Sequence, residues 1–285
     1  MKNFTLLAVF ILGMANMSCF EKNITSNVTL ENSSSTMKKS IIFDLDGVLC
    51  STNNLKAFQV IGITTTLEYI ATQWKLPSQK ELFDVLAAAP AIRHDDAFNQ
   101  GIRMPNIMVD WQCAAQSLPN IQQAMIDQIN GSDKNNIEKE LLINTIMMMT
   151  TPEIFVSTRQ TIPAGVELLQ ELKKNGYKLY VLSNWDPTSF PLFMQKFPEI
   201  FMYHEQPMFD GIMISGDVGL LKPDSVIFEQ CLNTFNLQAS DAIFIDDTIE
   251  NIQAAQQLGI SSIHCDKNNM QATRDQLIHL LKSLQ

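Results

Sequence analysis

"IIFDLDGVLC", residues 41–50, places two carboxylates directly after a short apolar run. Residues 41–43 predict the end of a buried strand, because short β-branched and aromatic runs are typical of parallel-sheet cores. Asp44 and Asp46 follow this strand. In open α/β sheets, ligands bind beyond the carboxyl ends of the strands. The stretch therefore predicts a ligand site at the edge of a parallel sheet.

The rest of the chain shows two kinds of pattern. Residues 53 to about 160 have almost only helical periodicity, whereas strands and helices alternate after Ile162. The predicted strands are 177–184, 241–247 and 260–265, and the predicted helices are 163–176, 224–237, 248–259 and 271–284. This alternation predicts a doubly wound, Rossmann-like α/β fold with a parallel sheet. We expect residues 37–52 and 161–285 to form this core, and residues 53–160 to form an α-helical cap domain inserted after the first strand.

The first 36 residues differ in composition from the rest of the chain. The apolar run 4–15 follows Lys2 as in a secretory signal peptide, and it is shorter than the roughly 20 residues of a transmembrane helix. Residues 23–36 are rich in Asn, Ser and Thr, which is typical of a linker. Two interpretations stay open. Either the protein is exported, periplasmic or lipid-anchored at Cys19, or translation starts at Met37 and the protein is cytoplasmic.

The overall composition restricts the class of partner. The chain carries a formal charge of −10 and has a pI near 4.8, which argues against a nucleic-acid partner held through its phosphates. Hydrophobic residues make up 46% of the chain, enough to bury a sizeable core. The five cysteines show no C-x-x-C spacing, so neither a zinc site nor a thioredoxin-like motif is indicated.

Three predicted strands end in polar side chains. These residues are Asp44, Asp46, Ser183, Asn184, Asp246 and Asp247. Because the carboxyl ends of parallel strands share one edge, we expect them to converge on one crevice, together with Lys222 of "GLLKPD". Crowded carboxylates need a cation, and oxygen ligands without His or Cys favour Mg²⁺, which also binds phosphate oxygens. The crevice therefore predicts a Mg²⁺-assisted phosphoryl-transfer site.

The segments "DLDGV", "LSN", "LKPD" and "FIDDTIEN" resemble the four signature motifs of the haloacid-dehalogenase-like (HAD) superfamily, in order and well spaced. The resemblance covers nearly all of residues 38–285. The insert after the first motif is similar to the helical cap of the subfamily containing haloacid dehalogenases, small-metabolite phosphatases and the phosphatase domain of epoxide hydrolase. A single D-x-D is weak evidence, whereas four motifs in register are specific.

The resemblance implies a role for each matched residue. Asp44 corresponds to the nucleophile that forms an aspartyl-phosphate, and Asp46 to the general acid and base. Ser183 and the Asn184 backbone correspond to the groups that bind the transferring phosphoryl group. Lys222 corresponds to the catalytic lysine that balances charge on the nucleophile and the phosphate.

The resemblance also implies the metal ligands. The Asp44 carboxylate, the Asp46 main-chain carbonyl and Asp247 would hold Mg²⁺, and Asp246 and Asn251 would lie behind them and orient Lys222. An aspartate at position 46 favours a phosphatase, because the dehalogenases of the superfamily do not keep one there. We therefore expect hydrolysis of a small phosphate monoester. A phosphomutase with the same residues and a non-catalytic binding protein on this fold are the alternatives.

Overall fold

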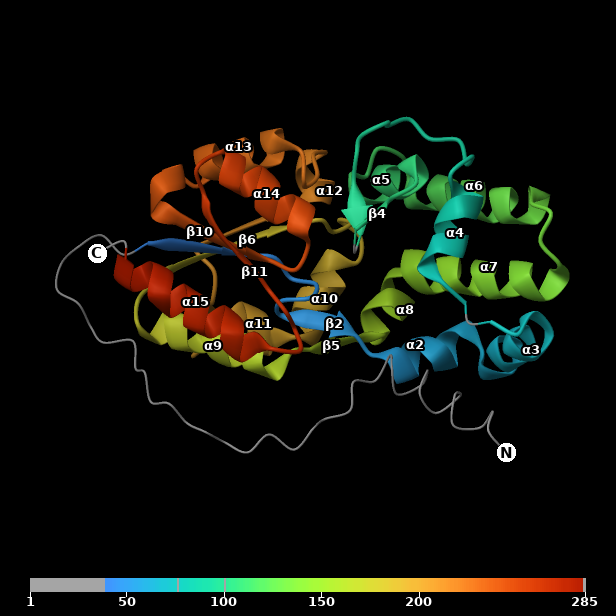
Figure 1. The fold of residues 1–285 in the computed structure, drawn as a ribbon, viewed down its shortest axis with the longest axis horizontal. Coiled ribbons are helices and arrows are strands. Elements are labelled where there is room, and N and C mark those ends of the chain that lie inside the picture. The colour runs from blue at the N-terminus through green and yellow to red at the C-terminus, as the bar shows by residue number, and fades with distance from the viewer. Residues whose placement is uncertain (1–38, 76, 100, 284–285) are drawn as a thin grey trace.

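The computed structural model describes residues 39–75, 77–99 and 101–283 (Figure 1). The predicted signal-like segment and linker, with Cys19 and Met37, lie outside these residues. Within the described part of the chain, no helix is both long enough and apolar enough to cross a bilayer.

Strands and helices alternate along most of the chain. The strands are β1 (Ser40–Phe43), β2 (Cys50–Thr52), β3 (Phe98–Asn99), β4 (Ile102–Arg103), β5 (Arg159–Thr161), β6 (Lys178–Ser183), β7 (Met202–Tyr203), β8 (Gln206–Pro207), β9 (Gly211–Ile214), β10 (Ala242–Asp246) and β11 (Ser261–His264). The helices are α2 (Asn54–Ile61), α3 (Ile63–Gln73), α4 (Gln79–Leu86), α5 (Asn106–Gln112), α6 (Leu118–Gly131), α7 (Asn136–Thr150), α8 (Pro152–Ser157), α9 (Pro163–Lys174), α10 (Phe190–Lys196), α11 (Pro198–Phe201), α12 (Ser215–Val218), α13 (Ser225–Thr234), α14 (Ile249–Gln257) and α15 (Met270–Ser283), with a short 3₁₀ helix, η1 (Ala239–Asp241).

Five strands form one parallel sheet in the order β11-β10-β1-β6-β9. Helices cover both faces of this sheet (Figure 1). Successive residues of β1 point to opposite faces: Ile41 and Phe43 pack in a cluster with residues of α9 and α15, and Ile42 packs with residues of α13 and α14. Burying each of these side chains contributes about 1.5–3 kcal/mol. The predicted doubly wound α/β fold is confirmed.

The edge strand β9 was not predicted from the sequence. Its first residue, Gly211, pairs with Tyr180 of β6. A Cβ at this glycine would lie only 2.4 Å from the Phe235 ring, which stacks on Tyr180 with ring centroids 5.1 Å apart. The strand joins the sheet through its parallel pairing with β6, a contact between distant residues that the sequence does not show.

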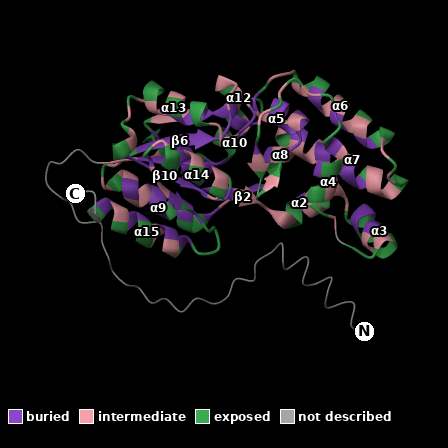
Figure 2. Cartoon of the chain, turned by 45° about the horizontal axis from the view of Figure 1, so that its top comes forward, coloured by how far each residue is buried: buried purple, intermediate pink, exposed green. Residues whose placement is uncertain are grey.

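The residues between β2 and β5 are almost wholly helical, apart from the short hairpin of β3 and β4. They bury their own apolar cluster, to which α4, α5, α6 and α7 contribute (Figure 2). Leu221, from the other part of the chain, is also buried in this cluster. The antiparallel pair of β2 and β5 joins the helical part to the sheet.

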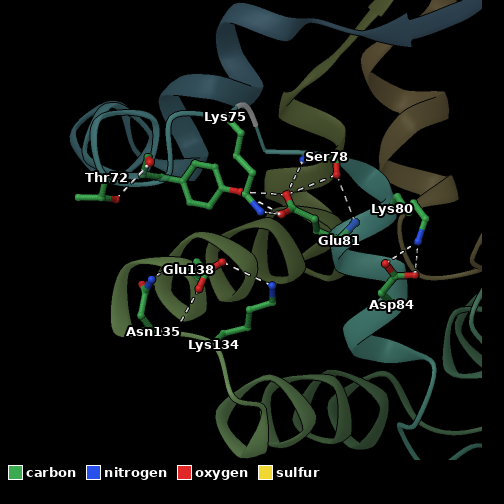
Figure 3. A network of polar contacts seen from close by, with 10 residues as sticks. Thr72, Lys75, Ser78, Lys80, Glu81, Asp84, Lys134, Asn135 and Glu138 are labelled. Carbon is green, nitrogen blue, oxygen red and sulfur yellow. Dashed lines mark hydrogen bonds and ion pairs between the residues drawn. The ribbon is translucent and has the colours of Figure 1, made fainter.

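Polar contacts define the starts of two helices in this helical part (Figure 3). Ser78 and Glu81 form a capping box at the start of α4, and Asn135 and Glu138 form another at the start of α7. The Tyr69 hydroxyl donates a hydrogen bond of 2.9 Å to Glu81 and so ties α3 to α4. Each N-cap contributes about 1 kcal/mol.

Candidate functional site

The polar ends of three neighbouring strands meet at one edge of the sheet. Asp44 directly follows β1, Ser183 ends β6 and Asp246 ends β10. The Asp44 amide donates a hydrogen bond of 2.9 Å to the Ile245 carbonyl, so the backbone ladder continues up to this residue. The structure therefore brings together groups that are about 200 residues apart in the sequence.

Lys222 lies at the centre of this edge. Its side chain is 1% exposed, and its Nζ lies 2.6 Å from Asp246 Oδ2 and 3.0 Å from Asp44 Oδ1. The Asn184 side chain accepts a hydrogen bond of 2.9 Å from the Lys222 amide and donates one of 2.9 Å to the Lys222 carbonyl. The carboxamide of Asn184 thus positions Lys222, a role that the sequence did not indicate.

Both carboxylate oxygens of Asp246 already bind other groups of the protein. Its Oδ1 accepts hydrogen bonds from the Thr248 amide at 2.7 Å and from Asn251 Nδ2 at 3.0 Å, in addition to the ion pair of Oδ2 with Lys222. Both Asp246 and Asn251 are buried. Contacts of this kind hold Lys222 in a single orientation beside Asp44.

Three carboxylates gather beside the lysine. One oxygen from each of Asp44, Asp246 and Asp247 lies within 4.8 Å of the others. Burial, reinforced by Asp246, raises the pKa of Asp44 above its usual range, although Lys222 and a hydrogen bond from Ser183 oppose this. Burial, followed by the charges of Asp44, Asp246 and Asp46, raises the pKa of Asp247 to about 8. The cluster carries more negative charge than Lys222 balances.

Gly47 gives Asp247 the space that it occupies. The glycine has φ +76°, and a Cβ at this position would lie 2.0 Å from Asp247 Oδ2. Asp44 Oδ1 is buried and, among the described residues, has only the ion-pair contact with Lys222 and no hydrogen bond. The cluster therefore offers carboxylate oxygens that can still accept a ligand bond, and it contains no His or Cys. Such a set of oxygen ligands fits a hard divalent cation such as Mg²⁺.

Asp46 lies outside this cluster. Its side chain is 54% exposed, and its Oδ1 forms an ion pair with the buried guanidinium of Arg159. The sequence did not single out Arg159 as a site residue. No local pattern marks it, because its contact with Asp46 depends on the pairing of β2 with β5.

The neighbouring Cys50 is a core residue. Its side chain is fully buried, and burial raises the pKa of the thiol far above its usual range. Such a thiol stays protonated and is no nucleophile. Cys113, Cys231 and Cys265 are likewise buried and form no disulfide within the described residues.

Known proteins resemble parts of this chain. A family model for haloacid dehalogenase-like hydrolases matches residues 38–259. The sesquiterpene phosphatase astK of Aspergillus oryzae is 35% identical over 97 residues, which span 34% of this chain and 46% of that protein. A glyceraldehyde 3-phosphate phosphatase of Pyrococcus furiosus is 26% identical over 103 residues, which span 36% of this chain and 40% of that protein. Each match thus spans less than half of the relative's length.

Solved structures agree in fold over longer stretches. HAD family enzyme bt-2542 from Bacteroides thetaiotaomicron, in complex with magnesium and inorganic phosphate, gives a TM-score of 0.52 at 16% identity and covers 80% of this chain and 93% of that chain. A HAD-like family hydrolase from Porphyromonas gingivalis gives a TM-score of 0.53 at 18% identity and covers 85% of this chain and 98% of that chain. Because the family model spans well over half of the sequence, this protein belongs to the haloacid dehalogenase-like hydrolase family.

Proposed function

We propose that this protein is a Mg²⁺-dependent phosphatase that hydrolyses a small phosphate monoester through an aspartyl-phosphate on Asp44. The observation that carries the proposal is the cluster of Asp44, Asp246 and Asp247 beside the buried Lys222. Two relatives named as phosphatases and a structural neighbour that holds magnesium and inorganic phosphate support it.

In the first step, a carboxylate oxygen of Asp44 forms a bond to phosphorus while the bond to the leaving oxygen breaks. Asp46 gives its proton to that oxygen, so the product leaves as an alcohol. In the second step, Asp46 takes a proton from water, the water oxygen bonds to phosphorus and the bond to Asp44 breaks. Inorganic phosphate leaves, and both aspartates return to their starting states.

Asp44, Asp247 and the main-chain carbonyl of Asp46 would hold Mg²⁺. When bound, the ion supplies positive charge that polarises the phosphoryl oxygens. Asp246 serves a different purpose, because its oxygens are already occupied by Lys222, Asn251 and the Thr248 amide. We therefore assign Asp246 and Asn251 to the positioning of Lys222.

The cations of the protein favour a substrate with one phosphoryl group. Among the described residues, Lys222 and Arg159 are the only buried lysine or arginine, and each is already paired with an aspartate. A polyphosphate would need further cations to balance its charge. A small phosphate monoester is thus the substrate class that this charge distribution accommodates.

The test is release of phosphate from p-nitrophenyl phosphate by the purified protein, with Mg²⁺ and with EDTA. We expect turnover that requires Mg²⁺ and is abolished in Asp44→Asn, because the amide cannot form the phosphoenzyme. Asp84→Asn is the matched control, since Asp84 is exposed and, in the part of the chain that the structure describes, pairs only with Lys80. Wild-type turnover by Asp44→Asn would exclude Asp44 as the nucleophile, and turnover in EDTA would exclude the metal requirement.

A further inference from the structure

We propose that Arg159 is a positioning residue that holds Asp46 where it can protonate the leaving group. This inference rests on the phosphatase proposed above and adds a residue to its site. The residue lies on β5, where the chain returns from the helical part to the sheet.

A buried cation lies beside each aspartate of the first motif. Of the lysines and arginines in the described residues, only Lys222 and Arg159 are buried. Lys222 contacts Asp44, and Arg159 contacts Asp46. Each aspartate of the first motif thus has its own buried cation.

Contacts with neighbouring side chains hold the guanidinium group of Arg159 in place. Arg159 lies opposite Thr52 in the β2–β5 pair, and its Nη1 donates a hydrogen bond of 2.6 Å to the Thr52 hydroxyl. Its guanidinium carbon lies 5.0 Å from the centroid of the Phe155 ring and 5.6 Å from that of Trp185. Because the guanidinium is fixed on these sides, its Nη2 presents a fixed charge to Asp46.

Stability alone does not account for an arginine at position 159. Its Nε is buried and has no hydrogen-bond partner among the described residues, which is unfavourable. Its only anionic partner is half exposed, so the ion pair recovers only part of the desolvation cost. An apolar side chain could form neither the ion pair with Asp46 nor the hydrogen bond with Thr52 that supports it.

The chemistry of Asp46 explains what this contact does. When the phosphorus–oxygen bond breaks, the Asp46 proton moves to the leaving oxygen and Asp46 becomes a carboxylate. Arg159 balances that new charge and keeps the carboxyl group in one rotamer, while the exposed remainder of the side chain stays open to the substrate. Loss of Arg159 should therefore matter most when the leaving group needs a proton.

The experiment compares kcat on two substrates, p-nitrophenyl phosphate with a good leaving group and glycerol 2-phosphate with a poor one. We expect Arg159→Met to lose at least roughly tenfold more kcat on glycerol 2-phosphate than on p-nitrophenyl phosphate, as expected for impaired general-acid catalysis. Asp46→Asn should show the same pattern with a larger loss, and Arg159→Lys a smaller one. Thr52→Val removes the hydrogen bond that supports Arg159. We expect it to lose kcat on glycerol 2-phosphate to an extent similar to that of Arg159→Lys.

Arg103→Met is the matched control, because Arg103 is exposed and its ion-pair partner among residues 39–75, 77–99 and 101–283 is Asp96. An equal loss on both substrates would make Arg159 a structural residue and overturn the inference, and so would a gain on glycerol 2-phosphate. If Arg159→Met does not fold, Arg159→Lys and Thr52→Val give the same comparison. Wild-type turnover by Asp44→Asn would instead refute the phosphatase itself, so the two failures are distinguishable.

Chemical rescue provides an independent readout. In Arg159→Ala, guanidinium ion at concentrations far below those that unfold proteins should restore kcat on glycerol 2-phosphate, because it can refill the vacated site. Sodium chloride at equal ionic strength should not. Equal effects of the two salts would contradict a positioning role for the guanidinium group.

Discussion

At the scale of single residues, Gly47 shows how closely the backbone approaches the candidate metal ligand. Its φ of +76° lies in the left-handed region, and the Asp247 carboxylate occupies the position of the missing side chain. Two separate constraints therefore require glycine here, one from the backbone and one from its neighbour.

Gly47→Ala should weaken Mg²⁺ binding, because the new methyl group would push Asp247 away from Asp44. We expect the Mg²⁺ concentration for half-maximal phosphatase activity to rise at least about tenfold, since displaced ligands lose geometry that Mg²⁺ demands. Gly259→Ala is the control, because it shares a positive φ of +80° but has no atom within 4 Å of its Cβ. A Mg²⁺ requirement of Gly47→Ala no higher than that of Gly259→Ala would contradict a role of the Asp247 contact in metal binding.

Lys222 is the cation on which the buried carboxylates depend when no metal is bound. Lys222→Met should destabilise the protein by about 3–5 kcal/mol, because it leaves Asp44 and Asp246 buried without a partner. Adding Asp246→Asn should recover part of this loss without restoring activity. Urea unfolding in EDTA measures both effects, and Lys80→Met at an exposed ion pair is the control. An unchanged midpoint in Lys222→Met would show that Lys222 does not balance these charges.

At the scale of elements, the loop between α4 and β3 connects the helical part to the segment that carries Lys222. The Arg93 Nη1 donates a hydrogen bond of 2.5 Å to the Gly219 carbonyl, and the Ser215 hydroxyl donates one of 2.6 Å to the Gln112 carbonyl. Leu221, next to Lys222, is buried in the apolar cluster of the helical part. The two parts are thus in contact directly beside the site.

The side chain of Asp110, on α5, binds the backbone of this loop. Substitution of Asp110 should therefore destabilise the loop. Its buried carboxylate accepts hydrogen bonds from the Ile92 amide at 2.7 Å, the Arg93 amide at 2.9 Å and Gln116 Nε2 at 2.7 Å. Asp110→Asn turns one acceptor into a donor, and we expect a loss of about 1–3 kcal/mol in the free energy of unfolding. Urea unfolding tests this against Asp84→Asn, and equal midpoints for the two variants would contradict it.

At the scale of the whole molecule, the acidic cluster should make stability depend on pH and on metal. In the folded protein the pKa of Asp247 is raised from 3.8 to about 8, so the folded state keeps a proton that the unfolded chain has released. Stability must then fall as the pH rises between these two values. At the upper end of this pH range, Mg²⁺ should restore the lost stability, because the bound ion takes the place of the proton on Asp247.

Thermal unfolding measures this effect. In EDTA, we expect the Tm of the wild-type protein to fall more steeply between about pH 5 and pH 8 than that of Asp247→Asn, whose side chain does not titrate. Mg²⁺ at the higher pH should raise the Tm of the wild type and have little effect on the variant. Parallel pH profiles for the two proteins would show that Asp247 does not titrate in this range.

The pattern of the sequence was sufficient to predict four of the five strands of the sheet and the meeting of their polar ends. Apolar runs give β1, β6 and β10, and the carboxyl ends of parallel strands share an edge wherever the chain alternates in this way. Asp44, Ser183 and Asp246 therefore had to lie close together. These predictions depend on local periodicity and on one general rule of topology.

The tertiary structure decided the features that depend on distant contacts. The strand β9 joins the sheet by pairing with β6, the Asn184 amide reaches Lys222, and Arg159 reaches Asp46 only because β2 pairs with β5. The sequence by itself determined which residues can carry the chemistry. Their partners required the folded chain, because a side-chain contact across more than a hundred residues leaves no periodic trace in the sequence.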